Sequence, residues 1–485
     1  MKFFVALFAF LFALFPLTDT DIWWHLACAR EWVVTWSPVR EGLPNIHEYF
    51  QQVVYAVYSV GGAPLLVAFK ALLWGIVFAL FLVPAGSRNR VELVLVAVAV
   101  FYLFIFRYQL EMRPVVFTLL FLGVYWNVVP WLLARFASGD KHATDRVKTC
   151  LVAIALLLLQ WLWCKFQGLY ILGPLFALLC LAHSLYRNRS AQQRRFLAAP
   201  AVFVALLFAM PLLHGEGMRL FLYPFGLLDR LLGISPSAAI FASEIAENRS
   251  PVTLLMAGEN SLVSLFMLAV VLFSLAYSLV NLFKYRRDFV LNVSLFVTSV
   301  LALAAERNFV LLMPLFIAVL CSPRQEILRL PDFAAMGLVV RVSPVVLVAC
   351  LLGFWAKSLA AYDKQMVAYQ RVPVGAAAWM KAHPHEGRLF NDDRAGGYLA
   401  FMNPTDSIYI DGRFILKTAD FFERYLRYSV DPALFLADAD SLGVDRALFP
   451  LRFYARWGGV INALEKSPEW SSTYVDAYFI VFARK

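Results

Sequence analysis

Two carboxylates, Asp19 and Asp21, stand two residues apart directly after the first apolar stretch of the chain, and a Trp-Trp-His run follows them. A tryptophan pair at the headgroup level of a bilayer is ordinary anchoring. An ionised carboxylate at that depth needs a proton, a cation or a hydrogen-bond donor. The pattern, completed by His25, predicts an extracytoplasmic acid/base or metal-binding pair. The simpler interpretation is that these polar residues only cap a membrane span.

The composition indicates which elements position these residues. The chain has 485 residues, of which 61% are hydrophobic and 16% charged, and its mean hydropathy is +0.68. Soluble domains are about a quarter charged. We therefore expect a polytopic α-helical membrane protein with about eleven spans. The expected spans are residues 3–17, 64–83, 91–106, 114–133, 149–164, 169–185, 196–213, 262–283, 289–305, 309–321 and 342–357.

Basic residues predict the orientation of these spans, because cytoplasmic loops carry an excess of Lys and Arg. The basic loops all fall on one side if the N-terminus is cytoplasmic, and an odd number of spans then puts the C-terminus outside. Because most of the net charge of +10 lies in these loops, it does not indicate nucleic-acid binding. The six cysteines have neither metal-site nor disulfide spacing. The loop residues are Arg88, Arg90, Arg135, Lys141, Arg146, Lys148, Arg187, Arg189, Arg194, Arg195, Lys284, Arg286, Arg287, Arg324, Arg329 and Arg341.

The outer side then receives a first loop (residues 18–62), a second loop (214–261) and the C-terminal region. Its short hairpins, its second loop and the outer half of the second span carry isolated charges. Snorkelling of long side chains to the headgroups would explain a single Lys or Arg among them. A shared polar cavity beneath the outer leaflet explains the whole set, and its cations would suit a lipid-linked phosphate. The charged residues are Lys70, Arg107, Glu111, Arg113, Lys165, Glu247, Glu306 and Arg307.

The division expected from composition is a membrane domain over residues 1–359 and a soluble extracytoplasmic α/β domain over 360–485. Strands are expected at 388–391, 407–410, 446–449 and twice within 472–482, with helices at 374–382, 421–428 and 432–442. Asp392, Asp411 and Arg413 stand at expected strand ends, where α/β folds place sites and where turns and ion pairs also occur.

Several stretches resemble one family. The run DTDIWWHL is similar to the D-x-D-x-W-W-H-L motif of bacterial multi-span proteins of the GT-C type, which are related to polyprenyl-phosphate-sugar-dependent glycosyltransferases. LFNDDRAGGYLAF and SIYIDGRF resemble the group's G-G-Y-L and D-G-R signatures in the tail. Arg113-Pro114, the segment PLLHGEGMRLFLYP and Glu306-Arg307-Asn308 also resemble its motifs.

The resemblance implies an inner-membrane GT-C-like enzyme whose site faces outward. Asp19 or Asp21 would be the catalytic base with His25 beside them, and the donor would be a sugar on a polyprenyl phosphate. Its acceptor would be an envelope protein or glycan. The cations that would face the donor phosphate are Arg107, Arg113, Lys165 and Arg307, with Glu111, Glu247 and Glu306 lining the same cavity.

Two alternatives remain within this reading. A divalent cation, Mg²⁺ or Mn²⁺, held by Asp19 and Asp21 could balance the phosphate charge, although the many outer basic residues favour a metal-free version.

The chain also departs from the group, since Lys165 and Gln167 replace an Asn and a His of its W-x-N-x-H motif. A non-catalytic scaffold that binds an envelope or secretion partner therefore competes with the enzyme. A transporter is disfavoured because the charges gather at one face.

Overall fold

The computed structural model describes residues 2–83, 93–138, 143–187, 198–259, 261–286, 288–321, 338–384, 386–452 and 455–485. They form two compact units. The first, here called the helical unit, comprises Met1–Phe15, Ala68–Ser235 and Ala242–Tyr362. The second, the sheet unit, comprises Pro16–Val67, Pro236–Phe241 and Asp363–Lys485. The first outer loop thus has its contacts with the C-terminal residues, although the sequence suggested that it belongs with the membrane helices.

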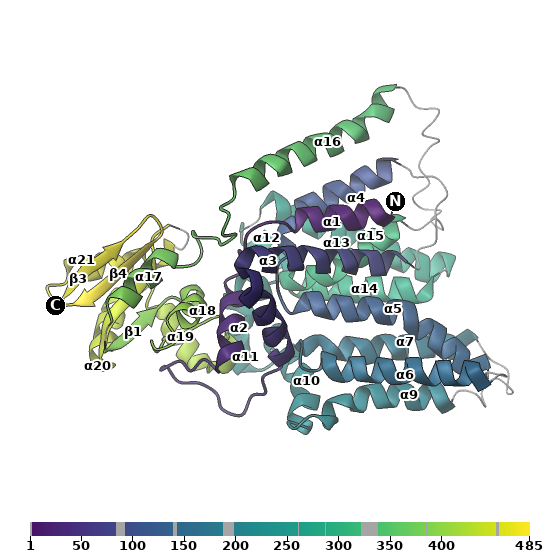
Figure 1. Ribbon diagram of the computed structural model, residues 1–485, viewed down its shortest axis with the longest axis horizontal. Helices are drawn as coiled ribbons and strands as arrows, with labels where there is room; N and C mark the ends of the chain where they lie inside the picture. Colours follow the sequence, from purple (N-terminus) through teal and green to yellow (C-terminus); the bar gives the residue numbers. More distant parts are fainter. Residues whose placement is uncertain are drawn as a thin grey trace. The chain divides into compact units, whose positions relative to one another are not determined.

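The helical unit is a bundle of apolar helices that lie side by side in Figure 1. Within it α13 contacts α14, α14 contacts α15, and α5 contacts both α6 and α7. Its helices are α1 (Lys2–Phe12), α4 (Leu93–Ile105), α5 (Val115–Ser138), α6 (Ala143–Trp163), α7 (Leu172–Arg187), α9 (Ala198–Ala209), α10 (Met218–Leu232), α12 (Pro251–Met256), α13 (Leu262–Val280), α14 (Phe289–Ala304), α15 (Phe309–Cys321) and α16 (Leu338–Ala361).

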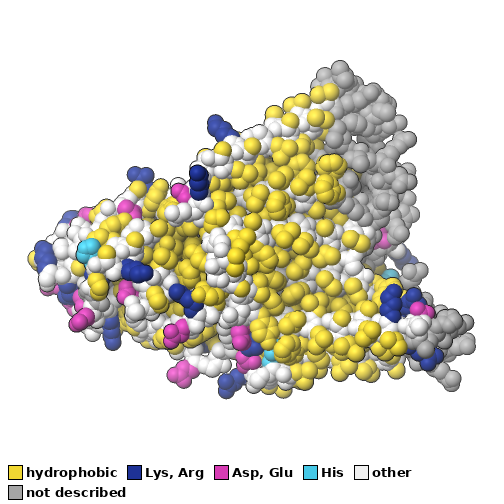
Figure 2. All heavy atoms as spheres, in the orientation of Figure 1, with side chains coloured by type: hydrophobic (Ala, Val, Ile, Leu, Met, Phe, Trp, Pro, Cys, Tyr) yellow, Lys and Arg dark blue, Asp and Glu magenta, His cyan; other side chains and the backbone are white. Residues whose placement is uncertain are grey.

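Apolar length marks this chain as a multi-pass membrane protein. Six of the described helices are long and apolar enough to cross a bilayer, or seven if the pair Ala198–Leu213 and Met218–Arg230, bent by 101°, is one span. The outward faces are apolar too, since α6 exposes Leu151, Ile154 and Leu158 at helical spacing. Hydrophobic side chains dominate the face of this unit drawn in Figure 2.

The predicted count of eleven spans is not confirmed by these helices, although shorter apolar helices occur at Phe3–Phe12, Val94–Ile105 and Phe289–Ala304. The orientation stays a prediction as well. Many of the loop cations on which it rests lie outside the described residues: Arg88, Arg90, Lys141, Arg189, Arg194, Arg195, Arg287, Arg324 and Arg329.

The sheet unit joins two parts of the chain that are far apart in sequence. Its N-terminal part holds α2 (Asp21–Arg30) and the beginning of α3 (Glu48–Leu82), a helix kinked at Gly62, whose φ of 63° a residue with a side chain rarely adopts. Its short segment from the second outer loop belongs to α11 (Pro236–Glu244), where Phe241 stacks on Phe422 with ring centroids 4.9 Å apart.

The C-terminal part of this unit is a four-stranded mixed sheet in the order β1-β2-β4-β3. The β1–β2 pair is parallel and the two other pairs are antiparallel. The inner strand β2 is almost wholly buried. The elements are α17 (Val374–Ala382), β1 (Arg388–Asn391), α18 (Asp393–Met402), α19 (Ala419–Arg427), α20 (Pro432–Ser441), β2 (Val444–Pro450), α21 (Gly458–Lys466), β3 (Trp470–Val475) and β4 (Phe479–Arg484).

Most of the elements expected in the tail are confirmed, and α17 and β1 have the expected bounds. Residues 407–410, however, form no strand of the sheet. Their backbone groups pair with the first loop and with one side chain: the Trp36 amide donates to the Ile408 carbonyl over 3.0 Å, and the Tyr409 amide donates to Asn391 Oδ1 over 2.8 Å. The Gly-Gly-Tyr-Leu run between the two expected strands is helical and belongs to α18.

Candidate functional site

The two predicted carboxylates lie at the N-terminus of α2. Asp19 precedes the helix and is 5% exposed, and its Oδ1 accepts a hydrogen bond from the Asp21 amide at 3.3 Å. It thereby satisfies one of the amides that a helix leaves open, in place of Thr20, whose side chain makes no cap. Asp21 is the first residue of α2 and keeps part of its surface exposed. Carboxylates at this end of a helix are stabilised by its dipole.

Helix α2 packs directly on α18, and the Gly-Gly pair makes that approach possible. A β-carbon at Gly397 would lie 2.8 Å from the Trp24 backbone nitrogen and 3.2 Å from the Trp24 Cβ, so only glycine fits there. Trp23 fills the space beside this contact, with its ring centroid 4.7 Å from that of Tyr398 and 5.8 Å from that of Phe401. The motif residues of the first loop and of the tail therefore pack against each other.

The Asp411-Gly412-Arg413 segment meets the same helix near its first residue. A β-carbon built on Gly412 would clash with Asp21 Oδ1 and would lie 3.5 Å from Trp24 Nε1. The Asp21 carboxylate thus occupies the space that any side chain at residue 412 would take. The D-x-D-x-W-W and D-G-R motifs are in contact at Asp21 and Gly412.

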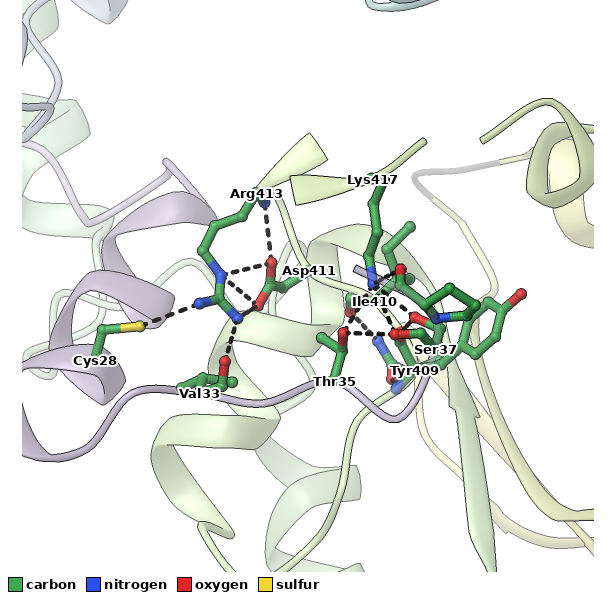
Figure 3. A network of polar contacts seen from close by, with 11 residues as sticks. Cys28, Val33, Thr35, Ser37, Tyr409, Ile410, Asp411, Arg413 and Lys417 are labelled. Carbon is green, nitrogen blue, oxygen red and sulfur yellow. Dashed lines mark hydrogen bonds and ion pairs between the residues drawn. The ribbon is translucent and has the colours of Figure 1, made fainter. Parts of the chain in front are cut away.

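Arg413 ties this segment to the first loop (Figure 3). Its guanidinium donates to Asp411 Oδ1 and Oδ2 from Nε at 3.0 and 2.9 Å, and Nη2 donates to Asp411 Oδ2 at 2.6 Å and to the Val33 carbonyl at 2.8 Å. Nη1 reaches Cys28 Sγ at 3.5 Å. Burial works against the charge of Arg413, but Asp411 outweighs it, so the pKa of Arg413 is raised. The thiol of Cys28 has a raised pKa because it is buried.

Lys417 makes a second set of contacts with the same loop (Figure 3). Its Nζ donates to Ser37 Oγ at 2.7 Å, to Thr35 Oγ1 at 2.8 Å and to the Pro38 carbonyl at 3.2 Å. Burial lowers the pKa of this ammonium to about 8, an effect that nearby Asp411 opposes and Arg413 adds to. The backbone continues the connection, since the Arg40 amide donates to the Leu416 carbonyl at 2.7 Å. Residues 33–40 are therefore held along the segment 408–417.

His25 lies within α2 among aromatic rings. It is 2% exposed, and its ring centroid lies 3.5 Å from that of Trp24, 4.7 Å from that of Phe50 and 5.1 Å from that of His47. The second imidazole, His47, was not among the residues that the sequence suggested. The two rings meet edge to face, at an interplanar angle of 89°.

Asp392, expected at a strand end, follows β1 and caps α18, because its Oδ1 accepts the Arg394 amide at 3.0 Å. Its Oδ2 accepts the Trp457 indole N–H at 2.6 Å. Burial raises the pKa of this carboxyl to about 6 and repulsion from Asp393 adds to the rise, against Arg456 and Trp457. These contacts describe a capping carboxylate within the α/β fold.

The expected cations of the hairpins lie in the helical unit, where two of the hairpins meet the second outer loop. Arg113 forms a two-pronged pair with Glu247, with distances of 2.8 and 2.7 Å. Arg307 donates to Asn248 Oδ1 at 3.0 Å. The neighbouring Glu306 has a raised pKa because it is half-buried and is repelled by Glu247. The structure thus gathers the charges of the residue 113, 247 and 306–307 segments.

Lys165 forms an ion pair with Glu216 of the second outer loop. Burial alone would raise the pKa of Glu216, but its hydrogen bond from Lys165 and their attraction lower it. The remaining predicted polar residues hydrogen-bond to backbone carbonyls or, in the case of Glu111, through its own carbonyl. Arg107 donates to the Phe104 carbonyl at 2.6 Å, the Glu111 carbonyl accepts the Trp74 indole at 3.1 Å, and Lys70 donates to the Phe15 carbonyl at 2.9 Å.

The predicted site residues thus form two groups. Asp19, Asp21, His25, Asp392, Asp411 and Arg413 belong to the sheet unit, and Arg107, Glu111, Arg113, Lys165, Glu247, Glu306 and Arg307 belong to the helical unit. In the described part of the chain no group of three or more His, Cys, Asp or Glu side chains is placed to hold a metal ion. The Asp19–Asp21 pair would supply only two carboxylates to one.

Sequence reasoning missed Lys417 and Glu216. A single lysine after the short apolar run 414–416 is typical of a solvated turn, and nothing in the sequence relates it to residues 35–37. Glu216 lies inside the segment PLLHGEGMRLFLYP, so the family resemblance pointed to its neighbourhood. The substitution of Lys165 for the group's asparagine was the available signal, because a buried lysine needs a counter-charge.

Solved structures with the same fold exist. Three structures of an oligosaccharyltransferase from the archaeon Archaeoglobus fulgidus match the chain. The complex of this enzyme, AglB, with an inhibitory peptide and a dolichol-phosphate has a TM-score of 0.55 at 11% identity, over 92% of this chain and 68% of that one. The complex with Zn and sulfate has a TM-score of 0.51 at 11% identity, over 99% of this chain and 73% of that one. The apo form has a TM-score of 0.54 at 10% identity, over 92% of this chain and 69% of that one.

No family model and no curated protein matches the sequence. At 10–11% identity the likeness to the archaeal enzyme concerns the fold alone. That fold is of the GT-C type, so the predicted GT-C-like architecture of a helical membrane domain with a small sheet domain is confirmed at this level.

Proposed function

We propose that the protein is an integral membrane glycosyltransferase that moves a sugar from a polyprenyl-phosphate carrier to an extracytoplasmic acceptor. The observation that carries this proposal is the pair Asp19–Asp21, held at a helix N-terminus by the tail in a chain whose fold resembles an oligosaccharyltransferase over 92% of its length. The AglB complex contains a lipid phosphate and a peptide, which are the two kinds of ligand that such a transfer needs.

Asp21 is the better candidate for the base. A general base must reach the acceptor hydroxyl, take its proton and release it later. Asp21 keeps exposed surface, whereas Asp19 is 5% exposed and already accepts a hydrogen bond from the Asp21 amide. We therefore assign proton removal to Asp21 and the support of its backbone to Asp19, while His25 lies one helical turn beyond Asp21 among aromatic rings.

A polyprenyl phosphate carries negative charge that Arg and Lys side chains can balance. Arg113 presents the planar fork that binds phosphate oxygens in pairs, and it now binds the two oxygens of Glu247 in that manner. Lys165 is similarly paired with Glu216. Phosphate binding would exchange these carboxylates for phosphate oxygens. Mg²⁺ or Mn²⁺ at Asp19 and Asp21 remains the metal-dependent version.

The test is transfer by the purified full-length protein from a radiolabelled polyprenyl-phosphate sugar. Asp21→Asn keeps the shape of the side chain and removes the base, so we expect turnover to fall by at least 10²-fold. Asp19→Asn should lower turnover less than Asp21→Asn does. The matched control is Asp420→Asn, an exposed carboxylate in the first turn of α19, which should leave turnover unchanged. Wild-type turnover by Asp21→Asn would refute the assignment.

A specific observation also favours the alternative, a non-catalytic scaffold for an envelope or secretion partner. The cations expected to face a phosphate, Arg113 and Lys165, have carboxylate partners within their own unit. A scaffold would bind no lipid-linked sugar, so binding of the labelled donor that responds to Arg113→Met separates the two functions even where the acceptor is unknown.

A further inference from the structure

We propose that the segment from Asp411 to Lys417 of the C-terminal region is a positioning element for the carboxylate of Asp21, with Gly412 as its point of contact. This inference rests on the proposed function and assigns the tail a part in the transfer step. Arg413 and Lys417 are positioning residues, because they act on Asp21 through the first loop.

The contact at Gly412 is specific to the carboxylate. A β-carbon at this residue would clash with Asp21 Oδ1, while the next nearest atom outside that side chain, Trp24 Nε1, would be 3.5 Å away. The carboxylate is the group on α2 that comes nearest to this glycine. A side chain at residue 412 must therefore displace the carboxylate or turn it about its side-chain torsions.

The segment that carries Gly412 is anchored on both sides of it. Asp411 and Arg413 form a buried ion pair whose side chains are 2% and 4% exposed, and Arg413 continues to the Val33 carbonyl. Four residues later Lys417 reaches Thr35 and Ser37. Upstream, Ile408 accepts the Trp36 amide. These bonds hold Gly412 in register with the loop that leads away from α2, as Figure 3 shows for the side chains.

A positioning role for residue 412 predicts an effect on kcat alone, which a role in general packing would not predict. A base displaced by about 1 Å can cost about 10²-fold in the chemical step, while substrate affinity is set elsewhere. Donor binding, assigned to cations of the helical unit, should not respond to residue 412. The expected signature is a fall in kcat with an unchanged KM for the lipid-linked donor.

The experiment compares Gly412→Ala and Gly412→Ser with Gly458→Ala in the full-length protein. Gly458 begins α21 in the same unit, and a β-carbon there meets nothing within 4 Å. We expect kcat to fall at least tenfold in Gly412→Ala and further in Gly412→Ser, with KM within twofold of wild type. Gly458→Ala should match wild type in both. Equal kcat in Gly412→Ala and Gly458→Ala would overturn the proposal.

A second variant keeps the proposal testable if Gly412→Ala fails to fold. Arg413→Lys retains the charge but loses the fork that joins Asp411 to Val33, so it too should lower kcat with KM unchanged. Wild-type kcat in Arg413→Lys would contradict the positioning role. Failure of the proposed function looks different: there Asp21→Asn itself keeps its activity, whereas failure of this inference leaves Asp21 essential and residues 412 and 413 tolerant.

Discussion

The substitution Asp411→Asn provides a quantitative test of how the tail holds the first loop. Asp411 is 1% exposed and faces two cations, Arg413 directly and Lys417 through space. Loss of its charge leaves the guanidinium of Arg413 buried without a counter-ion. Removal of one partner from a buried ion pair costs about 3–5 kcal/mol. The repulsion between Arg413 and Lys417 is then uncompensated as well.

Hydrogen exchange of backbone amides measures this cost where it acts. The Trp36 and Arg40 amides bond to carbonyls of the tail segment, at Ile408 and Leu416, so they exchange when the loop leaves it. Since about 1.4 kcal/mol is a tenfold change in an equilibrium constant, exchange should accelerate by roughly two to four orders of magnitude. The increase is limited by the global stability of the unit.

A matched control tests whether the effect comes from the burial of the ion pair or from the loss of any negative charge. Asp440 pairs with Arg484 at the surface, with a side chain that is 59% exposed, and such pairs contribute about 0–1 kcal/mol. Asp440→Asn should therefore change exchange at residues 36 and 40 by less than threefold. The double variant Asp411→Asn with Arg413→Met should recover much of the loss, because it leaves no buried charge unpaired. An Asp411→Asn protein whose exchange equals that of Asp440→Asn would refute the reasoning.

Two predictions concern pH. The pKa of Lys417 falls from 10.5 to about 8 in the folded chain, so the unfolded chain binds more protons between these values and the free energy of unfolding should rise with pH there, by at most about 3 kcal/mol. Lys417→Met should lack that rise when denaturation midpoints at pH 7.5 and 9.5 are compared. Asp392 has the opposite sign: its pKa is raised from 3.8 to about 6, so the folded chain keeps the proton longer and stability should fall between these values, by at most about 3 kcal/mol. The same comparison of midpoints at pH 4 and 7 should show no such fall in Asp392→Asn, and an equal fall in both proteins would contradict the shift.

The sequence alone determined the properties that depend on local pattern. Long apolar runs identified a membrane protein, because the bilayer demands them over about 20 residues. Local sequence pattern identified β1 and the helix α17, and both have the expected bounds. The pairing of Asp19 with Asp21 also needed no tertiary information, because residues so close in sequence are close in space.

Only the tertiary structure decided what those motifs do to each other. Contacts such as that of Arg413 with Cys28 join residues 385 positions apart, and a local sequence pattern cannot predict such a contact. The Gly-Gly-Tyr-Leu run lies in a helix, and its second glycine lets α18 approach the backbone of Trp24. Tertiary contacts also turned Ser37 and Lys417, which are unremarkable in sequence, into one buried hydrogen-bonded group. The physical reason is that burial and close approach need two surfaces in contact. Each sequence motif describes only one of the two surfaces, so the contact between them cannot be read from either motif alone.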